Sequence, residues 1–152
     1  MKKYNVFISH GWEYDEQYNK VEDWLDEAYS KCLLVWDNYS VPLLDTDLNP
    51  RSSIGKKKLQ EKINNQIAQA SIVLILSGMY TAHPYWIEYE VLKAANYGKY
   101  IIGVEPWKQE STPKVVSDYA DIMVEWNKSS VTKAMLESLT HNMITSCVTL
   151  NS

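Results

Sequence analysis

The sequence predicts an α/β domain built on an open, parallel sheet of five strands, with helices on both faces. Two observations lead to this fold class. Short apolar runs alternate with segments of helical periodicity along the whole chain. One of these runs, residues 72–76, contains no polar residue, which is typical of a strand buried on both faces. Strict alternation of strands and helices favours parallel strands joined by right-handed crossovers.

Five segments are predicted to be strands because they are short, apolar and mostly rich in β-branched or aromatic residues. They are residues 4–9, 33–41, 71–77, 100–104 and 122–126.

Helices are predicted between the strands from apolar residues that recur at helical spacing. The first two cover residues 15–29 and 56–70. The third begins at Pro84, which suits the first turn of a helix, and Gly98 ends it as a C-cap. The last runs from about residue 130 to about residue 145, and the connection 105–120 has room for one helical turn.

Five strand–helix units favour the flavodoxin-like strand order 2-1-3-4-5, in which the first and third strands are neighbours. Their crossovers then leave on opposite faces, and ligands bind outside the carboxyl ends of the strands at that point. One predicted site loop, residues 9–13, follows the first strand, and the other, residues 77–83, follows the third. The chain shows no repeat, linker or low-complexity tract, so we expect one domain over residues 1–147 and a frayed tail at 148–152.

The composition excludes several function classes. A chain of 152 residues fits one domain, and a net charge of −4 argues against a general nucleic-acid binder. The two cysteines lie far apart and the three histidines lack metal-ligand spacing, so no disulfide framework or metal site is expected. The apolar run near the N-terminus is too short for a signal peptide, and no stretch is long enough to span a membrane. A cytoplasmic location is therefore expected.

The residues at the predicted strand ends exclude related chemistries. A phosphoacceptor receiver domain needs acidic residues where Ser9, His10 and Ser77 stand. The chain contains no glycine-rich dinucleotide or phosphate-binding motif and no nucleophile elbow. His10 and His83 fall in the two site loops, where a hydrogen-bonding role is favoured over a catalytic one because only geometry would establish catalysis.

Two carboxylates on the third helix are candidate catalytic groups. Glu88 and Glu90 are separated by about 200° around the helix axis, so they cannot share a face. Glu90 lies about 60° from Ile87, which predicts a position at the rim of the core, while Glu88 points towards solvent. The alternative is a surface Glu90 paired with Lys93 at i+3, and spacing alone leaves both interpretations open.

The sequence resembles TIR (Toll/interleukin-1 receptor) domains. Phe7-Ile8-Ser9-His10 resembles their first conserved box, and Trp86 with Glu90 matches the W-x-x-x-E pattern of the NAD-cleaving members. More closely, the chain is similar to the bacterial TIR-like family that includes the signal-producing enzymes of Thoeris anti-phage defence. The other similar segments are residues 38–42, 78–80, 85–90, 99–107 and 120–127, so the resemblance extends from residue 3 to about residue 140.

This resemblance implies a TIR fold and assigns roles to particular residues. Glu90 is implied as the catalytic residue, and Ser9, His10, Trp12, Ser77 and Tyr80 as substrate-binding residues. Aromatic stacking on the substrate is a further role that Trp12, Tyr80 or Trp86 is able to fill, although each is individually expected to be a packing residue. NAD is implied as the substrate, with no cofactor and no metal.

One loop departs from the family pattern. Residues 81–84 lack the Lys or Arg expected before the tryptophan, which puts a phosphate contact from this loop in doubt.

The implied reaction is cleavage of the nicotinamide–ribose bond of NAD. Nicotinamide leaves as a neutral group, so one carboxylate that stabilises the ribosyl cation is sufficient. If water is excluded, a nucleophile in the same dinucleotide captures this cation and gives a cyclic ADP-ribose-type signal. Such a diffusible product would reach a separate effector protein in anti-phage defence.

Two rival functions remain open. The first is a non-enzymatic module that works through TIR–TIR assembly, and the second is another N-glycosidase, such as a nucleoside deoxyribosyltransferase-like enzyme. The sequence also leaves open the product, the activating trigger, the effector and whether the protein forms a homo-oligomer.

Overall fold

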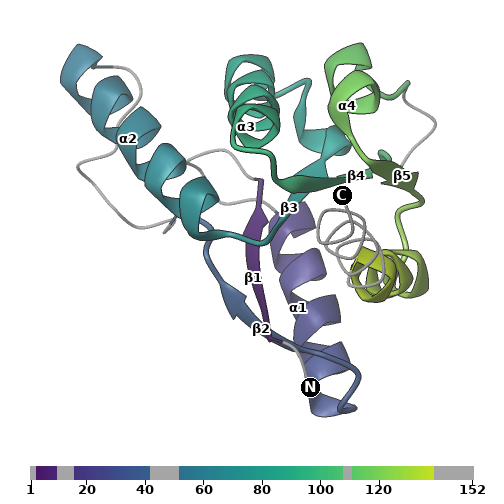
Figure 1. Cartoon of the computed structure of the whole chain (residues 1–152). Coiled ribbons are helices and arrows are strands. Elements are labelled where there is room, and N and C mark those ends of the chain that lie inside the picture. The colour runs from purple at the N-terminus through teal and green to yellow at the C-terminus, as the bar shows by residue number, and fades with distance from the viewer. Residues whose placement is uncertain (1–2, 10–15, 42–51, 108–110, 139–152) are drawn as a thin grey trace, which may run out of the picture.

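The computed structural model confirms the predicted fold class and strand order. It describes residues 3–9, 16–41, 52–107 and 111–138 (Figure 1). All strand pairs are parallel, and the sheet has the order β2-β1-β3-β4-β5. The strands are β1 (Lys3–Ile8), β2 (Val35–Asn38), β3 (Ile72–Leu76), β4 (Tyr100–Val104) and β5 (Ile122–Val124).

The central strand β3 forms the middle of the hydrophobic core, as its unbroken apolar run predicts. All five of its residues are buried. β3 pairs with β1 on one side, where Val6 lies opposite Ile72, and with β4 on the other, where Val104 lies opposite Leu76. The carboxyl ends of β1 and β3 therefore finish side by side at one edge of the sheet.

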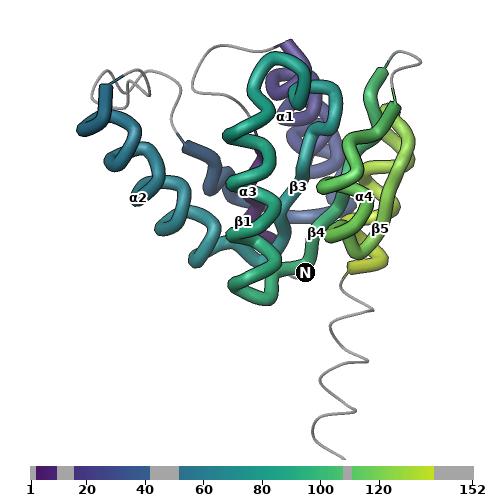
Figure 2. The backbone as a smooth tube through the Cα atoms, turned by 90° about the horizontal axis from the view of Figure 1, so that it is seen from above, coloured from purple at the N-terminus to yellow at the C-terminus, as the bar shows by residue number. Residues whose placement is uncertain are grey.

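Helices cover both faces of the sheet, as expected from right-handed crossovers in this strand order. α2, α3 and α4 lie on one face, where α2 contacts α3 and α3 contacts α4, while α1 and the helical residues 128–138 lie on the other (Figure 2). The helices are α1 (Glu16–Ser30), α2 (Ser53–Gln69), α3 (Pro84–Asn96) and α4 (Lys114–Tyr119), and η1 (Ser77–Met79) is one turn of 3-10 helix after β3.

The third helix ends as the sequence predicts. Gly98 has a φ of +67°, a left-handed conformation that glycine adopts without strain. Its N–H donates to the Ala95 carbonyl at 3.1 Å, and the Lys99 N–H donates to the Ala94 carbonyl at 3.0 Å. These two bonds form the Schellman motif that follows many helix C-termini.

Several element boundaries differ from the prediction because polar side chains cap the backbone. α2 begins three residues before the predicted start at residue 56, since the Ser52 hydroxyl accepts from the Gly55 N–H at 2.9 Å. β2 ends at Asn38, short of the predicted residue 41, where the Asn38 side chain accepts from the Ser40 N–H at 2.9 Å. The last helix begins at residue 128, and the Asn127 side chain accepts from the Ser130 N–H at 2.8 Å. Its predicted continuation and the predicted tail fall outside the described residues.

None of the helices in the described part of the chain combines the length and apolar character needed to cross a membrane.

Candidate functional site

Ser9 joins the carboxyl ends of the two central strands. Its hydroxyl accepts a hydrogen bond from the Leu76 N–H at 2.7 Å, and its own N–H donates to the Leu74 carbonyl at 2.8 Å. The residue is completely buried. Ser9 therefore fixes the two predicted site loops at their bases, a structural role beside the substrate-binding role implied by its position. His10 and Trp12, which follow it, lie outside the described residues.

A network of polar side chains connects the end of β1, next to Ser9, to α1 and to the end of β2. The sequence interpretation missed this network. The Ser40 hydroxyl accepts a hydrogen bond from the Ile8 N–H at 2.9 Å, and this bond is buried. The Asn38 amide donates to the Tyr18 hydroxyl at 2.6 Å and to the Glu22 carboxylate at 2.7 Å. Burial raises the pKa of the Tyr18 hydroxyl above its usual value. The signal in the sequence was Asn38, because an asparagine side chain often accepts a hydrogen bond from the backbone N–H two residues later. Here that N–H belongs to Ser40.

The loop after β3 forms the second part of the site. Ser77 is buried, and its hydroxyl oxygen has no hydrogen-bond partner among the described residues. Tyr80, at the end of η1, is half-buried. A Cβ atom placed on Gly78 would lie 2.5 Å from the Gln17 side-chain oxygen, so a larger residue here would require the end of the Gln17 side chain of α1 to shift.

Glu90 is the most unusual polar residue of the described chain. Its exposure is only 1%, and its Oε2 atom has no hydrogen-bond partner among the described residues. Burial raises the pKa of this carboxyl well above its usual range, because the charged form loses the hydration it has in water. The predicted position at the rim of the core is therefore wrong, and so is the alternative of a surface pair with Lys93. Glu88, by contrast, is exposed as predicted.

The complete burial of Glu90 has a geometric cause in α3. The prediction counted a buried stripe of Ile87, Val91 and Ala94, which leaves Glu90 at its edge. Trp86 is also buried, at 8% exposure. Because Trp86 lies about 40° beyond Glu90 around the helix, the buried arc extends past the glutamate on both sides.

Trp86 is held by an aromatic cluster between α2 and α3. Its ring packs edge-on against Tyr85, with ring centres 5.0 Å apart, and against Tyr89 at 5.9 Å. The Tyr89 hydroxyl donates to the Asn64 side chain of α2 at 2.8 Å, and the Lys56 ammonium lies 4.3 Å from the centre of the Tyr85 ring. These contacts fix α3 against α2, and Trp86 has packing contacts beside the stacking role predicted for it.

The surroundings of Glu90 determine what the site is able to do chemically. α3 contacts η1, β3 and β4, so the helix with the buried carboxyl adjoins the turn with the buried Ser77 hydroxyl. Helix side chains tilt towards the helix N-terminus, which for α3 is the end at which β3 finishes. These two buried polar groups lie on adjoining elements and have no partners among the residues that the structure describes, which leaves hydrogen-bonding capacity for a ligand.

Comparison with known proteins identifies the family. Residues 7–111 match the family described as Thoeris protein ThsB, TIR-like domain. The chain belongs to this family. No curated protein matches this chain.

Two solved structures are similar to this TIR-like domain in fold. One is the CMP N-glycosidase BcmB of Clostridium botulinum, with 13% sequence identity, coverage of 86% of this chain and 97% of that chain, and a TM-score of 0.53. The other is a 2-deoxyribosyltransferase from Bacillus psychrosaccharolyticus, with 13% identity, coverage of 84% and 90%, and a TM-score of 0.50. At this identity the similarity establishes the shared fold.

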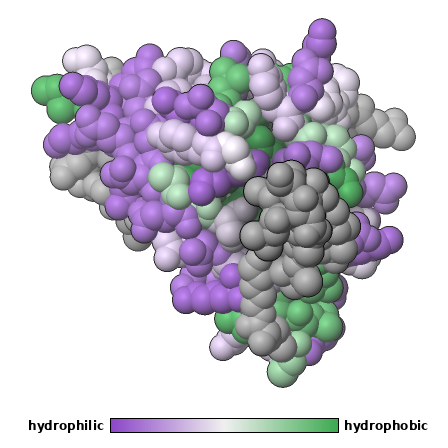
Figure 3. All heavy atoms as spheres, in the orientation of Figure 1, coloured by the Kyte–Doolittle hydropathy of each residue, from purple (hydrophilic) through white to green (hydrophobic). Residues whose placement is uncertain are grey.

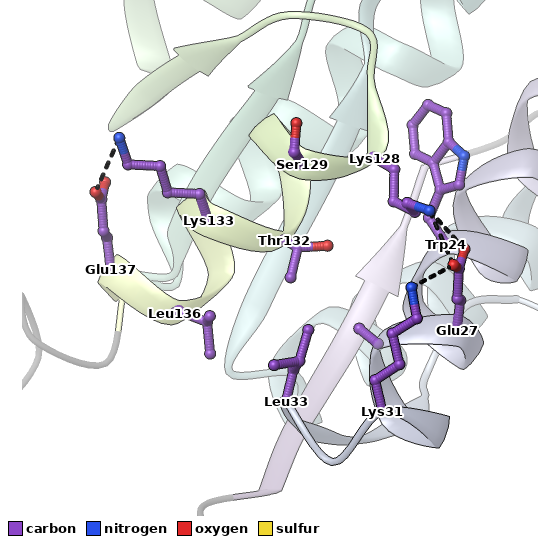
Figure 4. Close-up of a pocket in the computed structure, with 11 residues that line it drawn as sticks. Trp24, Glu27, Lys31, Leu33, Lys128, Ser129, Thr132, Lys133, Leu136 and Glu137 are labelled. Atoms are coloured by element: carbon purple, nitrogen blue, oxygen red, sulfur yellow. Dashed lines mark hydrogen bonds and ion pairs between the residues drawn. The ribbon is translucent and has the colours of Figure 1, made fainter.

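The TIR-like domain also has a cavity that the sequence interpretation missed. It measures about 530 Å³ and lies between α1 and residues 128–138 (Figure 4). Trp24, Leu33 and Leu136 contribute apolar surface, and none of the predicted site residues lines it. Glu27 accepts from both Lys31 and Lys128 at 2.8 Å, and these hydrogen bonds, that from Lys128 first, lower the pKa of Glu27 to about 2.

Apolar side chains on the face shown in Figure 3 are scattered in small groups among hydrophilic ones. The described residues contain no group of three or more His, Cys, Asp or Glu side chains arranged to hold a metal ion.

Proposed function

We propose that this TIR-like domain is an enzyme that cleaves the nicotinamide–ribose bond of NAD, with Glu90 as its catalytic carboxylate. The observation that carries the proposal is the complete burial of Glu90, whose Oε2 atom has no hydrogen-bond partner among the described residues. A buried carboxyl without a partner destabilises a fold, and an apolar residue at the same place would not. Perturbed carboxyls of this kind are concentrated at functional sites.

The chemistry of NAD suits a single carboxylate. The C1′–N bond breaks with its electron pair passing to the pyridinium nitrogen, so nicotinamide leaves neutral and needs no general acid. Positive charge then develops on the ribose, as in glycoside hydrolysis. An ionised Glu90 beside the ribose would stabilise this charge strongly, because the side chain is buried away from water.

The other site residues have supporting roles in the proposal. The Ser77 hydroxyl is a hydrogen-bond partner for the ribose or the diphosphate, and Tyr80 lines the same wall. His10 and Trp12 contact the substrate from the loop after Ser9. Capture of the ribosyl cation within the dinucleotide gives a cyclic ADP-ribose-type product, which carries the signal to a separate effector.

The experiment compares wild type, Glu90→Gln and Glu88→Gln with NAD as substrate. Purified protein is incubated with NAD, and NAD, nicotinamide and the nucleotide products are measured by mass spectrometry. The same measurement on lysates of expressing cells, with and without phage infection, covers an activity that needs a trigger. We expect Glu90→Gln to lose on the order of 100-fold or more in rate, as when a preorganised electrostatic contact is removed.

The matched control and the rival substrates make this test decisive. Glu88→Gln is expected to keep most activity, because Glu88 is exposed on the opposite side of α3. Parallel incubations with CMP and with deoxynucleosides test the N-glycosidase alternative. Cleavage of those compounds but not NAD would replace the proposed substrate. If no substrate is cleaved under any condition, the non-enzymatic assembly module is the better explanation.

A further inference from the structure

Buried polar contacts hold the chain on both sides of the site loop that follows β1. On the strand side, Ser9 is completely buried and is hydrogen-bonded to β3. On the helix side, Tyr18 lies in the first turn of α1 and is also buried. The end of the neighbouring Gln17 side chain lies against Gly78, in the turn after β3. The start of α1 therefore adjoins the bases of both predicted site loops.

A serine side chain completes the pairing at the end of β1. The backbone ladder between β1 and β2 ends where the Tyr39 N–H donates to the Val6 carbonyl at 2.8 Å. The Tyr39 carbonyl, which a regular parallel ladder would offer to Ile8, accepts instead from the Gln66 side chain of α2 at 3.0 Å. The Ile8 N–H donates to the Ser40 hydroxyl at 2.9 Å in a buried hydrogen bond. Ser40 therefore takes the place of a strand carbonyl at the residue before the site loop begins.

The Tyr18 hydroxyl connects this serine to α1. The Asn38 side chain accepts from the Ser40 N–H at 2.9 Å and donates to the Tyr18 oxygen at 2.6 Å. The Ser40 O–H donates to the same tyrosine oxygen. The Tyr18 O–H itself donates to the Glu22 carboxylate at 3.4 Å. One phenolic oxygen thus receives two hydrogen bonds from the segment at the end of β2, and its removal would take away the contact that orients the Ser40 side chain.

From this geometry we infer that Tyr18 is a positioning residue of the site: through Ser40, its hydroxyl sets the backbone from which the substrate loop, residues 9–13, starts. This inference rests on the proposed function, in which that loop contacts the substrate, but it does not depend on which substrate is cleaved. Small displacements at the base of a binding loop are costly, because a misplacement of about 1 Å lowers rates by up to about 100-fold.

The test compares Tyr18→Phe with Tyr4→Phe, since each change removes one hydroxyl and keeps the ring. Tyr4 is also buried, but its hydroxyl has no hydrogen-bond partner among the described residues, and it lies near the start of β1, at the other end of the strand from Ser9. Two properties are measured. The first is KM and kcat for NAD, under conditions in which wild type shows turnover. The second is hydrogen exchange of the peptide that covers residues 5–13, followed by mass spectrometry.

We expect Tyr18→Phe to raise KM by about tenfold, as when a partner behind a binding group is lost, with a smaller change in kcat. The amides at the end of β1 should also exchange faster, because local opening there becomes easier. Tyr4→Phe should change neither property. A role in stability alone would act differently, because a smaller folded fraction lowers the apparent kcat and leaves KM unchanged.

Ser40→Ala tests whether Tyr18 acts through Ser40. This change removes the hydroxyl that bonds the Ile8 N–H, so it should raise KM at least as much as Tyr18→Phe. The double variant should then have the KM of Ser40→Ala alone, because the effects of residues in one hydrogen-bond network do not add. KM changes that multiply in the double variant would overturn the inference. If Tyr18→Phe does not fold, an unchanged KM or unchanged exchange in Ser40→Ala overturns it instead.

The remaining outcomes separate this inference from the proposed function. The inference requires both changes in Tyr18→Phe, so an unchanged KM, unchanged exchange or a fall in kcat alone overturns it, while NAD cleavage that depends on Glu90 stands. If wild type cleaves CMP and not NAD, the proposed substrate is wrong, and the same comparison made with CMP tests the role of Tyr18. If wild type cleaves neither NAD, CMP nor deoxynucleosides, the inference and the proposed function fail together.

Discussion

Replacing Glu90 by glutamine should change how the stability of the domain depends on pH. In the folded protein the carboxyl is completely buried, and its pKa is raised well above the value of 4.5 for a free glutamate. In the unfolded chain the same group is hydrated and titrates near its ordinary value. The native state therefore binds more protons than the unfolded state between these two pKa values.

The sign and size of the effect follow from this difference in bound protons. The contribution of Glu90 to the stability of the domain is highest below the pKa that this carboxyl has in the unfolded chain. This contribution falls as the pH rises towards the raised pKa of the folded protein. Within that window the folding equilibrium constant falls by up to about tenfold for each pH unit, the effect of one proton. Glutamine has almost the same volume and does not titrate, so Glu90→Gln should lack this loss and gain stability relative to wild type as the pH rises.

Urea unfolding of both proteins at a series of pH values, from about the unfolded pKa upwards, checks this prediction. The informative quantity is the difference in stability between variant and wild type, because other titrating groups contribute equally to both. Glu88→Gln is the control, because it makes the same chemical change at an exposed position of the same helix. A difference for Glu90→Gln that does not change with pH would refute the reasoning and show that the carboxyl is already ionised in the folded domain.

Three further outcomes follow from individual contacts. Ser9→Ala should destabilise the domain by about 1–3 kcal/mol, because it leaves the buried Leu76 N–H unpaired. Thermal unfolding measures this loss of stability. A loss below about 0.5 kcal/mol would argue against the prediction, since ordinary surface substitutions have effects of that size. Gly103→Ala should lower the stability of the domain by about 1–3 kcal/mol in the same assay, because a Cβ at this position would collide with side chains of α4 and β5. An unchanged melting temperature would mean that these side chains move aside freely. Lys128→Ala should raise the pKa of Glu27 from about 2 towards its ordinary value, as followed by NMR titration of the carboxyl; no movement would mean that Lys31 alone holds it.

Much of the fold could be predicted because its signals are local and regular. The apolar run of β3, the helical periodicities and Gly98 each act within a few residues, and together they determine the strand order through general rules of chain connection. The first and last residues of helices and strands were harder to predict where a single polar side chain determines the boundary. Ser52 starts α2 and Asn38 ends β2 by bonding a nearby backbone N–H, and periodicity does not register such bonds.

The candidate site was harder to predict because burial depends on neighbouring elements. Glu90 was predicted on α3 at the edge of the buried stripe, but the buried arc of the helix extends past it to Trp86, which packs against Tyr89. The hydrogen bond from Leu76 to Ser9 joins residues 67 positions apart, and no local pattern indicates it. The cavity beside Glu27 likewise depends on a salt bridge between α1 and residue 128.

The strand order has a consequence for synthesis of the chain. β1 emerges first from the ribosome, and β2 then covers one of its edges, but the other edge faces no partner until β3 has also emerged. The Ser9 hydroxyl likewise waits for the N–H of residue 76. The chain must therefore be made as far as β3 before β1 is paired on both sides. Until then the unpaired backbone N–H and C=O groups of β1 are available to other nascent chains, so the interval before β3 emerges is a period of exposure to aggregation for this domain.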